Sequence, residues 1–147
     1  MKEGEMEMIF SLSSLLVMPF WISMIVLPRW RWTEHVMRSP LVAAPPALLY
    51  AFLVLPRLAE IFPAVFNPEL GRIASLLGTP EGATIAWAHF LAFDLFVGRW
   101  IYLDGRERGV NAFLMAPILF LTLMLGPLGF LLYLAARAFH GQEKEER

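Results

Sequence analysis

The sequence predicts an all-α fold, an integral membrane four-helix bundle with a short interfacial helix between spans two and three. Hydrophobic residues make up 58% of the 147-residue chain, whereas soluble domains contain roughly 45–50%. The mean hydropathy is +0.59, and the apolar residues are gathered into blocks long enough to cross a bilayer. We therefore interpret residues 1–147 as a single transmembrane domain.

Composition also excludes several classes of function. The formal net charge is -1, so bulk charge indicates no nucleic-acid partner. The chain has no cysteine, which rules out disulfides, thiolate metal sites and cysteine nucleophiles. We find no phosphate-binding loop and no nucleophile elbow, which argues against ATPase and hydrolase functions. A homo-oligomer is compatible with all of these observations.

The first span is predicted at residues 8–28. The residues before it are acidic, whereas a secretory signal peptide begins with basic residues, so we expect a retained membrane helix. Its serines can donate hydrogen bonds back to helix carbonyls. Pro19 is predicted to kink the helix, because proline cannot donate to the carbonyl one turn earlier.

Residues 29–38 form a short basic segment that contains Trp30 and Trp32. Tryptophan favours the headgroup region of a bilayer and arginine favours the water beyond it, so the segment is predicted to be an interfacial loop. Two interpretations stay open. The loop either anchors the chain in the membrane or forms a specific site for an anionic lipid.

The second span is predicted at residues 39–62. Arg57 and Glu60 lie three residues apart near its end, where their side chains can face each other. Residues 68–77 follow, with apolar residues at helical spacing and Arg72 on the opposite side. This amphipathic pattern predicts a helix that lies on the membrane surface.

The third span, residues 81–103, is the most informative part of the sequence. Thr79 is predicted to cap its first turn. The span is apolar and long enough to cross a bilayer, yet it contains His89, Asp94 and Arg99. A charge at mid-bilayer costs roughly 2.5–3.5 kcal/mol, so such residues usually face a protein interior and indicate a functional site.

The fourth span is predicted at residues 112–139. A Gly-Pro-Leu-Gly sequence interrupts it, and we assign structural roles to Gly126, Pro127 and Gly129. Proline breaks the hydrogen-bond ladder and glycine permits close approach of a neighbouring backbone. The sequence therefore predicts a kink at this point, with space opened beside the third span.

The ionisable residues of the third span suggest proton transfer. At about 100° per residue, His89, Asp94 and Asp104 fall within one arc of about 140°. Histidine titrates near neutral pH and a carboxyl group in apolar surroundings can hold a proton, so His89 and Asp94 are the candidate catalytic pair. The structural alternative is that Asp94 pairs with Arg57 or Arg99, or hydrogen-bonds across helices. We assign structural roles to Arg99, which lies off this arc, and to Asp104.

Aromatic and apolar residues lie beside these groups. The candidate substrate-binding residues are Phe90, Phe93, Val97 and Trp100. They either line a pocket for an extended apolar ligand or simply pack in the core and against lipid. His89 is the only histidine well inside a span, so no metal-ligand spacing exists and we expect neither metal nor cofactor.

Two segments, residues 87–100 and 125–133, resemble the neoxanthin synthase-like family of small membrane proteins. The resemblance implies a four-helix membrane protein whose plant members act on a carotenoid epoxide. In that isomerisation the epoxide opens and an allene forms without redox change. The reaction needs an acid at the epoxide oxygen and a base for a polyene C–H, and the resemblance implies that His89 and Asp94 supply them.

The preferred hypothesis is therefore an isomerase that acts on a carotenoid or another isoprenoid. Its expected partners are an apolar polyene or isoprenoid ligand and membrane lipid. The alternatives are a non-catalytic membrane protein that binds a pigment or lipid between its helices, and a small structural subunit of a membrane complex. Because the chain begins at a spanning helix without a plastid transit peptide, we expect a prokaryotic cytoplasmic membrane.

Overall fold

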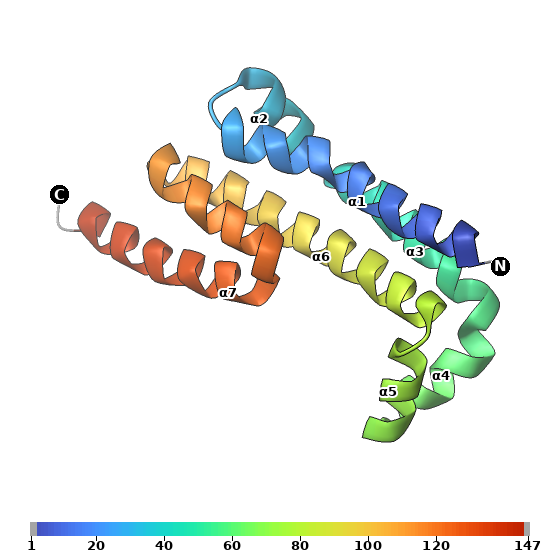
Figure 1. The fold of residues 1–147 in the computed structure, drawn as a ribbon. Helices are drawn as coiled ribbons and strands as arrows, with labels where there is room; N and C mark the ends of the chain where they lie inside the picture. The colour runs from blue at the N-terminus through green and yellow to red at the C-terminus, as the bar shows by residue number, and fades with distance from the viewer. Residues whose placement is uncertain (1–2, 146–147) are drawn as a thin grey trace. The chain divides into compact units, whose positions relative to one another are not determined.

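The computed structural model describes the backbone of residues 3–145 and the side chains of residues 4–138. The regular elements of this part of the chain are helices, which confirms the predicted all-α class (Figure 1). They are α1 (Glu3–Val26), α2 (Arg31–Arg38), α3 (Ala44–Val54), α4 (Leu58–Phe66), α5 (Leu70–Leu77), α6 (Pro80–Glu107) and α7 (Ala112–Glu145). Two 3₁₀ turns, η1 (Pro40–Ala43) and η2 (Leu55–Arg57), flank α3.

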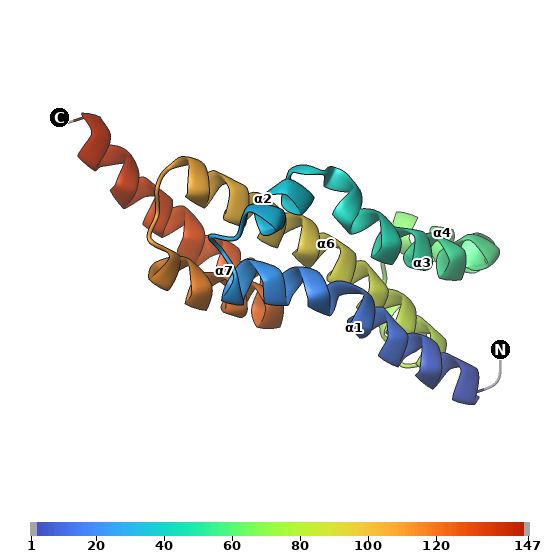
Figure 2. The same ribbon diagram turned by 90° about the horizontal axis from the view of Figure 1, so that it is seen from above.

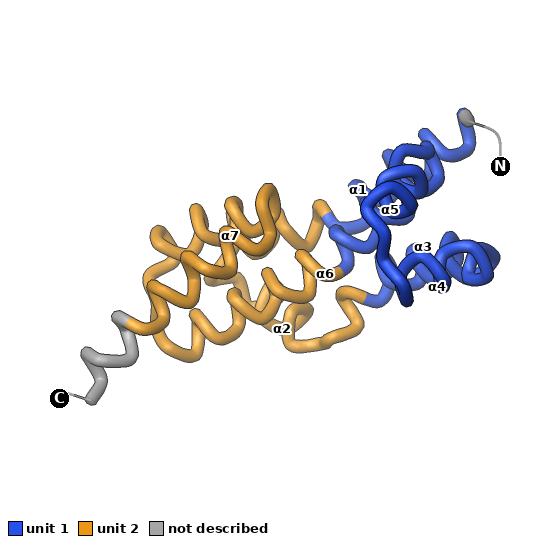
Figure 3. The backbone as a smooth tube through the Cα atoms, turned by 90° about the horizontal axis from the view of Figure 1, so that it is seen from below, with its two compact units in different colours: residues 1–17, 44–92 blue, residues 18–43, 93–147 orange. Residues whose placement is uncertain are grey.

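The helices group into two compact units (Figure 3). The first unit contains residues 1–17 and 44–92, and the second contains residues 18–43 and 93–147. Helices α1 and α6 each contribute residues to both units, whereas α3, α4 and α5 belong to the first and α2 and α7 to the second.

Within the described residues, three helical stretches are long and apolar enough to cross a membrane: Gly4–Val26, Pro40–Phe66 and Ala112–Ala138. Their surfaces carry large exposed apolar side chains, such as Phe66 at 81% and Phe113 at 85% exposure. Helix α6, the predicted third span, is not among these three stretches. Its ionisable residues lower its hydropathy.

The second predicted span is broken by a 3₁₀ turn. It is built from η1, α3, η2 and α4, so the helix axis is interrupted at Leu55–Arg57. Pro56 lies inside this turn and has no backbone N–H to continue an α-helical ladder. The predicted surface helix at residues 68–77 corresponds to α5, which ends just before Gly78 as expected. Thr79 Oγ1 accepts a hydrogen bond from the Gly82 N–H at 3.0 Å, which confirms the predicted cap of α6.

Residues 31–38 form helix α2, whereas the sequence predicted an interfacial loop. Thr33 and Met37, one helical turn apart, are both buried. The Arg99 side chain from α6 donates to the carbonyls of Met37 at 2.5 Å and Arg38 at 2.8 Å. These contacts satisfy carbonyls at the end of α2 that have no helical partner. Arg99 therefore links α6 to the end of α2.

Helix α7 contains the predicted kink, and the kink is sharper than expected. Leu125 has the non-helical angles φ -141° and ψ 53°. The chain reverses there, so the two halves of α7 run side by side (Figures 1 and 2). A methyl group at Gly129 would overlap the backbone of Thr122 in the other half. Pro127 cannot donate to the carbonyl one turn earlier, and the glycines permit the close approach.

Asp104 joins α6 to the second half of α7. Its carboxylate accepts hydrogen bonds from the Tyr133 hydroxyl, from Arg137 Nε at 3.0 Å and from Arg108 Nε at 2.8 Å. Burial alone would raise the pKa of Asp104, but these hydrogen bonds outweigh it and the pKa lies below its ordinary value. The Trp100 ring packs edge-on against Tyr133, with 5.5 Å between centroids.

We predict that Asp104→Asn destabilises the protein by about 2 kcal/mol at pH 7, because hydrogen bonds to a charged acceptor are lost. A depressed pKa gives stability that is present above the unfolded value, about 3.9, and is lost as the pH falls through the folded value. Thermal unfolding in detergent micelles should therefore show that the wild type is more stable than the variant at pH 7 and that this difference in the free energy of unfolding disappears in acid. Glu107→Gln, an exposed carboxylate nearby, is the control and should change little. An equal loss of stability in the variant at pH 7 and in acid would contradict this account.

Candidate functional site

The first unit contains a cavity of about 490 Å³ between α3, α4, α5 and the first half of α6, here called the α6 cavity. Its volume lies within the range typical of small-molecule sites. Its apolar lining includes Ile61, Val65, Ile73, Leu76, Ile85 and Phe90. Its polar lining consists of Tyr50, Arg57, Glu60, Thr79, Glu81 and His89.

Local signals in the sequence build the walls of this cavity. Helix α5 ends at Leu77, and Thr79 caps the start of α6 two residues later. Gly82 then allows α6 to begin close to the end of α5, since a methyl group there would overlap the Leu76 carbonyl. The tight connection brings the apolar face of α5 to the first turns of α6.

An ion pair lies in the wall of the α6 cavity. Arg57 of η2 donates a hydrogen bond to the Glu81 carboxylate in the first turn of α6. Arg57 also approaches Glu60 at 3.7 Å, which confirms the pairing predicted from their spacing. The Arg57 and Glu81 side chains are 35% and 24% exposed. An arginine between two carboxylates gives this wall both hydrogen-bond donors and acceptors.

His89 lies two turns further along α6, on the same cavity. Its ring meets the Tyr50 ring of α3 at a centroid distance of 5.2 Å and an interplanar angle of 64°. The His89 side chain is half-buried, and its neighbour Phe90 also lines the cavity. The imidazole is therefore a titratable group beside apolar walls, positioned by an aromatic contact.

Asp94, the other candidate catalytic residue, belongs to the second unit. Its carboxyl group lies against Gly126 at the α7 kink, where a methyl group would overlap it. No side chain among residues 4–138 forms a hydrogen bond or ion pair with Asp94. The structure thus associates Asp94 with the kink, and it does not line the α6 cavity.

The remaining candidate ligand-binding residues also belong to the second unit. Phe93 is 60% exposed, and Val97 is half-buried. Trp100 packs beside Phe130, with 5.8 Å between centroids, and Arg137 lies over its ring. Of the predicted site residues, the α6 cavity therefore includes His89 and Phe90.

These groups define the chemistry that the α6 cavity can support. A histidine can donate or accept a proton near neutral pH. The Arg57–Glu81 pair can hold a polar group of a ligand, while the branched and aromatic side chains bind its apolar part. Among the described residues, no three His, Asp or Glu side chains are close enough to hold a metal ion.

Comparison with known protein families identifies the family of this chain. The family model of ABA DEFICIENT 4-like proteins matches residues 8–133, which includes every candidate site residue. The chain belongs to the ABA DEFICIENT 4-like family. This result confirms the resemblance found in residues 87–100 and 125–133, and with the apolar helices it identifies a membrane protein.

A curated relative is the chloroplast protein ABA DEFICIENT 4 of Arabidopsis thaliana, which is 27% identical over 136 residues. The alignment covers 88% of this chain and 60% of the relative, so the chain spans about three fifths of that protein's length. Because the relative is chloroplastic by name, the comparison gives no support to the expected prokaryotic cytoplasmic membrane. No solved structure matches the chain.

Two polar residues of the site, Glu81 and Tyr50, are not indicated by the sequence pattern. The available signal was a charged residue at the end of each of two apolar segments, Arg57 and Glu81. Predicting that Arg57 pairs with Glu81 requires knowing how α4 and α5, which lie between them in the sequence, fold back. Residue spacing alone does not give this information.

We predict that Arg57→Met and Glu81→Gln each lower the stability of the protein by about 1 kcal/mol, the scale of a partly exposed ion pair. The double variant should lose less than the sum of the two, because the second substitution removes a partner already lost. Unfolding in detergent micelles measures all three. Glu69→Gln, which changes an exposed carboxylate of the same unit that does not line the α6 cavity, is the matched control. Strictly additive losses would show that the pair is not coupled.

Proposed function

We propose that this protein is a membrane isomerase acting on a carotenoid epoxide or another polyene isoprenoid by acid–base chemistry in the α6 cavity. The observation that carries the proposal is the position of His89, a titratable ring in an apolar cavity of ligand size. Membership of the ABA DEFICIENT 4-like family supports a carotenoid-related role.

The proposed reaction conserves atoms and electrons. An acid protonates the epoxide oxygen as its C–O bond breaks, a base removes a proton from a polyene carbon, and an allenic alcohol forms. His89 is assigned one of these proton transfers, since the histidine pKa suits both directions near neutral pH. The Arg57–Glu81 pair orients the oxygenated end of the ligand, and the apolar walls hold the adjoining chain.

Asp94 does not line the α6 cavity, and we propose it separately as a proton-transfer group at the α7 kink. It is the remaining carboxyl group inside the predicted third span, five residues beyond His89 on α6. Its position against Gly126 supports a functional assignment. An unpaired carboxyl group in apolar surroundings lowers the stability of the protein, and such groups usually belong to functional sites. This assignment is independent of that of His89 and is tested separately.

The proposed membrane arrangement is a four-helix bundle. Helix α6 has 28 residues, about 42 Å of helix, which exceeds the roughly 30 Å hydrocarbon core. We assign it as a membrane helix beside the apolar stretches Gly4–Val26 and Pro40–Phe66. The third apolar stretch, Ala112–Ala138, reverses at Leu125, so we assign its two halves together to the remaining position of the bundle. We assign α5 to the interface, because its Leu70 is 88% exposed while Arg72 lies on the opposite side.

A second candidate function is the storage or transport of a pigment or lipid without conversion. Apolar side chains line much of the cavity, and its arginine is paired with carboxylates. Such a cavity suits an apolar ligand whether or not the ligand reacts. In this case the purified protein would retain a polyene, and substitution of His89 would leave the bound ligand unchanged.

We predict that His89→Gln lowers turnover by about 10²–10⁴-fold, because the positioned acid or base is lost while a polar side chain of similar length remains. Asp94→Asn keeps the shape and removes the titrating group, so it tests the separate proposal for Asp94, and a comparable loss would support that proposal. The measurement is product formed from a panel of epoxy-carotenoids by membranes containing each variant, normalised to the amount of protein.

His35→Gln is the matched control, because His35 is an exposed histidine of α2 and does not line the α6 cavity. Its turnover should equal that of the wild type. Full activity of His89→Gln would remove His89 from the chemistry. Absence of turnover by the wild type, with a polyene retained on purification, would favour the storage function.

A further inference from the structure

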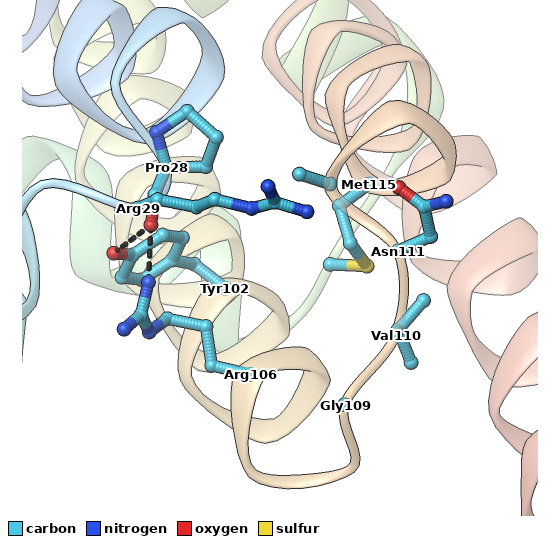
Figure 4. A pocket seen from close by; sticks show the side chains of 9 residues that line it. Pro28, Arg29, Tyr102, Arg106, Gly109, Val110, Asn111 and Met115 are labelled. Carbon is cyan, nitrogen blue, oxygen red and sulfur yellow. Dashed lines mark hydrogen bonds between the residues drawn. The ribbon is translucent and has the colours of Figure 1, made fainter.

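A second cavity, of about 280 Å³, lies in the second unit (Figure 4). The loop after α1, the end of α6 and the start of α7 enclose it, and we call it the loop cavity. Its lining includes Arg29, Tyr102, Arg106, Asn111 and Met115. None of these residues lines the α6 cavity, so the two sites share no side chain.

One of the two arginines of the loop cavity is fully engaged. Arg106 donates to the Pro28 carbonyl, which also accepts a hydrogen bond from the Tyr102 hydroxyl at 2.8 Å. Arg106 Nη2 pairs with Glu34 at 2.7 Å. A hydrogen bond from Arg38 and the charge of Arg106 lower the pKa of Glu34. Glu34 is therefore ionised at neutral pH, and its carboxylate is shared between Arg106 and Arg38.

Arg29 is different, because no described side chain or carbonyl accepts a hydrogen bond from it or pairs with it. Figure 4 shows its side chain extending from the loop after α1 toward Asn111 and Met115. Arg29 is exposed, and its positive charge borders the loop cavity without an ion-pair partner among the described residues. A guanidinium presents a planar set of donors that matches the oxygens of a phosphate.

The opposite wall favours the same kind of ligand. Asn111 Oδ1 accepts the Phe113 N–H at 3.0 Å, which leaves the Asn111 amide N–H₂ available as a donor. Helix α7 begins at Ala112, beside this amide, and the positive end of its dipole favours an anion. Val110 and Met115 supply an apolar boundary.

The neighbouring residues indicate the depth of the loop cavity in the membrane. Trp30 and Trp32 follow Arg29 and are 53% and 62% exposed. Exposed tryptophans concentrate at the headgroup level of a bilayer, where lipid phosphates lie. From this geometry we infer that the loop cavity binds the phosphate group of an anionic membrane lipid, with Arg29 as its principal ligand.

The test uses the purified full-length protein and native mass spectrometry. The wild type should retain phosphatidylglycerol in preference to phosphatidylcholine, and Arg29→Gln should weaken phosphatidylglycerol binding by about tenfold, the loss of one charged hydrogen-bonding partner. Arg29→Lys should lose less, since it keeps the charge and loses only the planar fork. Circular dichroism verifies that each variant keeps its helix content.

Arg31→Gln is the matched control, because it removes the same charge two residues away without touching the loop cavity. It should weaken binding much less than Arg29→Gln. Equal losses from both variants, or no preference for the anionic lipid, would overturn the inference. Inorganic phosphate added to lipid-free protein distinguishes the source. Stabilisation that depends on Arg29 would identify a free phosphate as sufficient, and its absence would show that the site requires the lipid.

Discussion

The cost of placing ionisable side chains on an apolar helix governs this structure. Helix α6 carries these groups along its length, and other elements supply partners for the groups near its two ends, whereas Asp94 has no such partner among the described residues. Arg57 meets Glu81 at one end, and Tyr133 and Arg137 meet Asp104 at the other. Unpaired, each group would cost several kcal/mol in hydrocarbon, so these contacts determine which helices associate within each unit.

The functional groups follow from the same constraint. His89 lies beside Tyr50 in a largely apolar cavity, and the Arg57–Glu81 pair gives that cavity polar groups. A partly polar site among apolar walls suits a hydrocarbon ligand with an oxygenated end. Arg29 provides the contrast, because its charge has no ion-pair partner among the described residues and lies in the loop segment that also carries the interfacial tryptophans. The two cavities thus suit two different ligand chemistries.

Features set by neighbouring residues could be predicted from the sequence, whereas those set by chain topology could not. The Thr79 cap, the end of α5 before Gly78 and the kink beside Pro127 depend on local backbone chemistry. Helix α2 was mistaken for a loop, because its stability depends on burial of Met37 and on a distant arginine. Helical spacing grouped His89 with Asp94, but spacing along one helix does not show which other elements pack against each residue. His89 lies beside Tyr50 in one unit, and Asp94 lies beside Gly126 in the other.

The central claim is that a polyene occupies the α6 cavity, and the absence of native cysteine makes a direct measurement available. Ala86→Cys introduces a thiol into the cavity lining, and Ala59→Cys introduces one on the exposed surface of α4. The measurement is the rate of maleimide labelling in membranes with and without an added epoxy-carotenoid. We expect the ligand to slow labelling at position 86 by at least about tenfold, in line with micromolar binding at a tenfold ligand excess, and to leave position 59 unchanged. Equal labelling at both positions with and without the ligand would contradict the account.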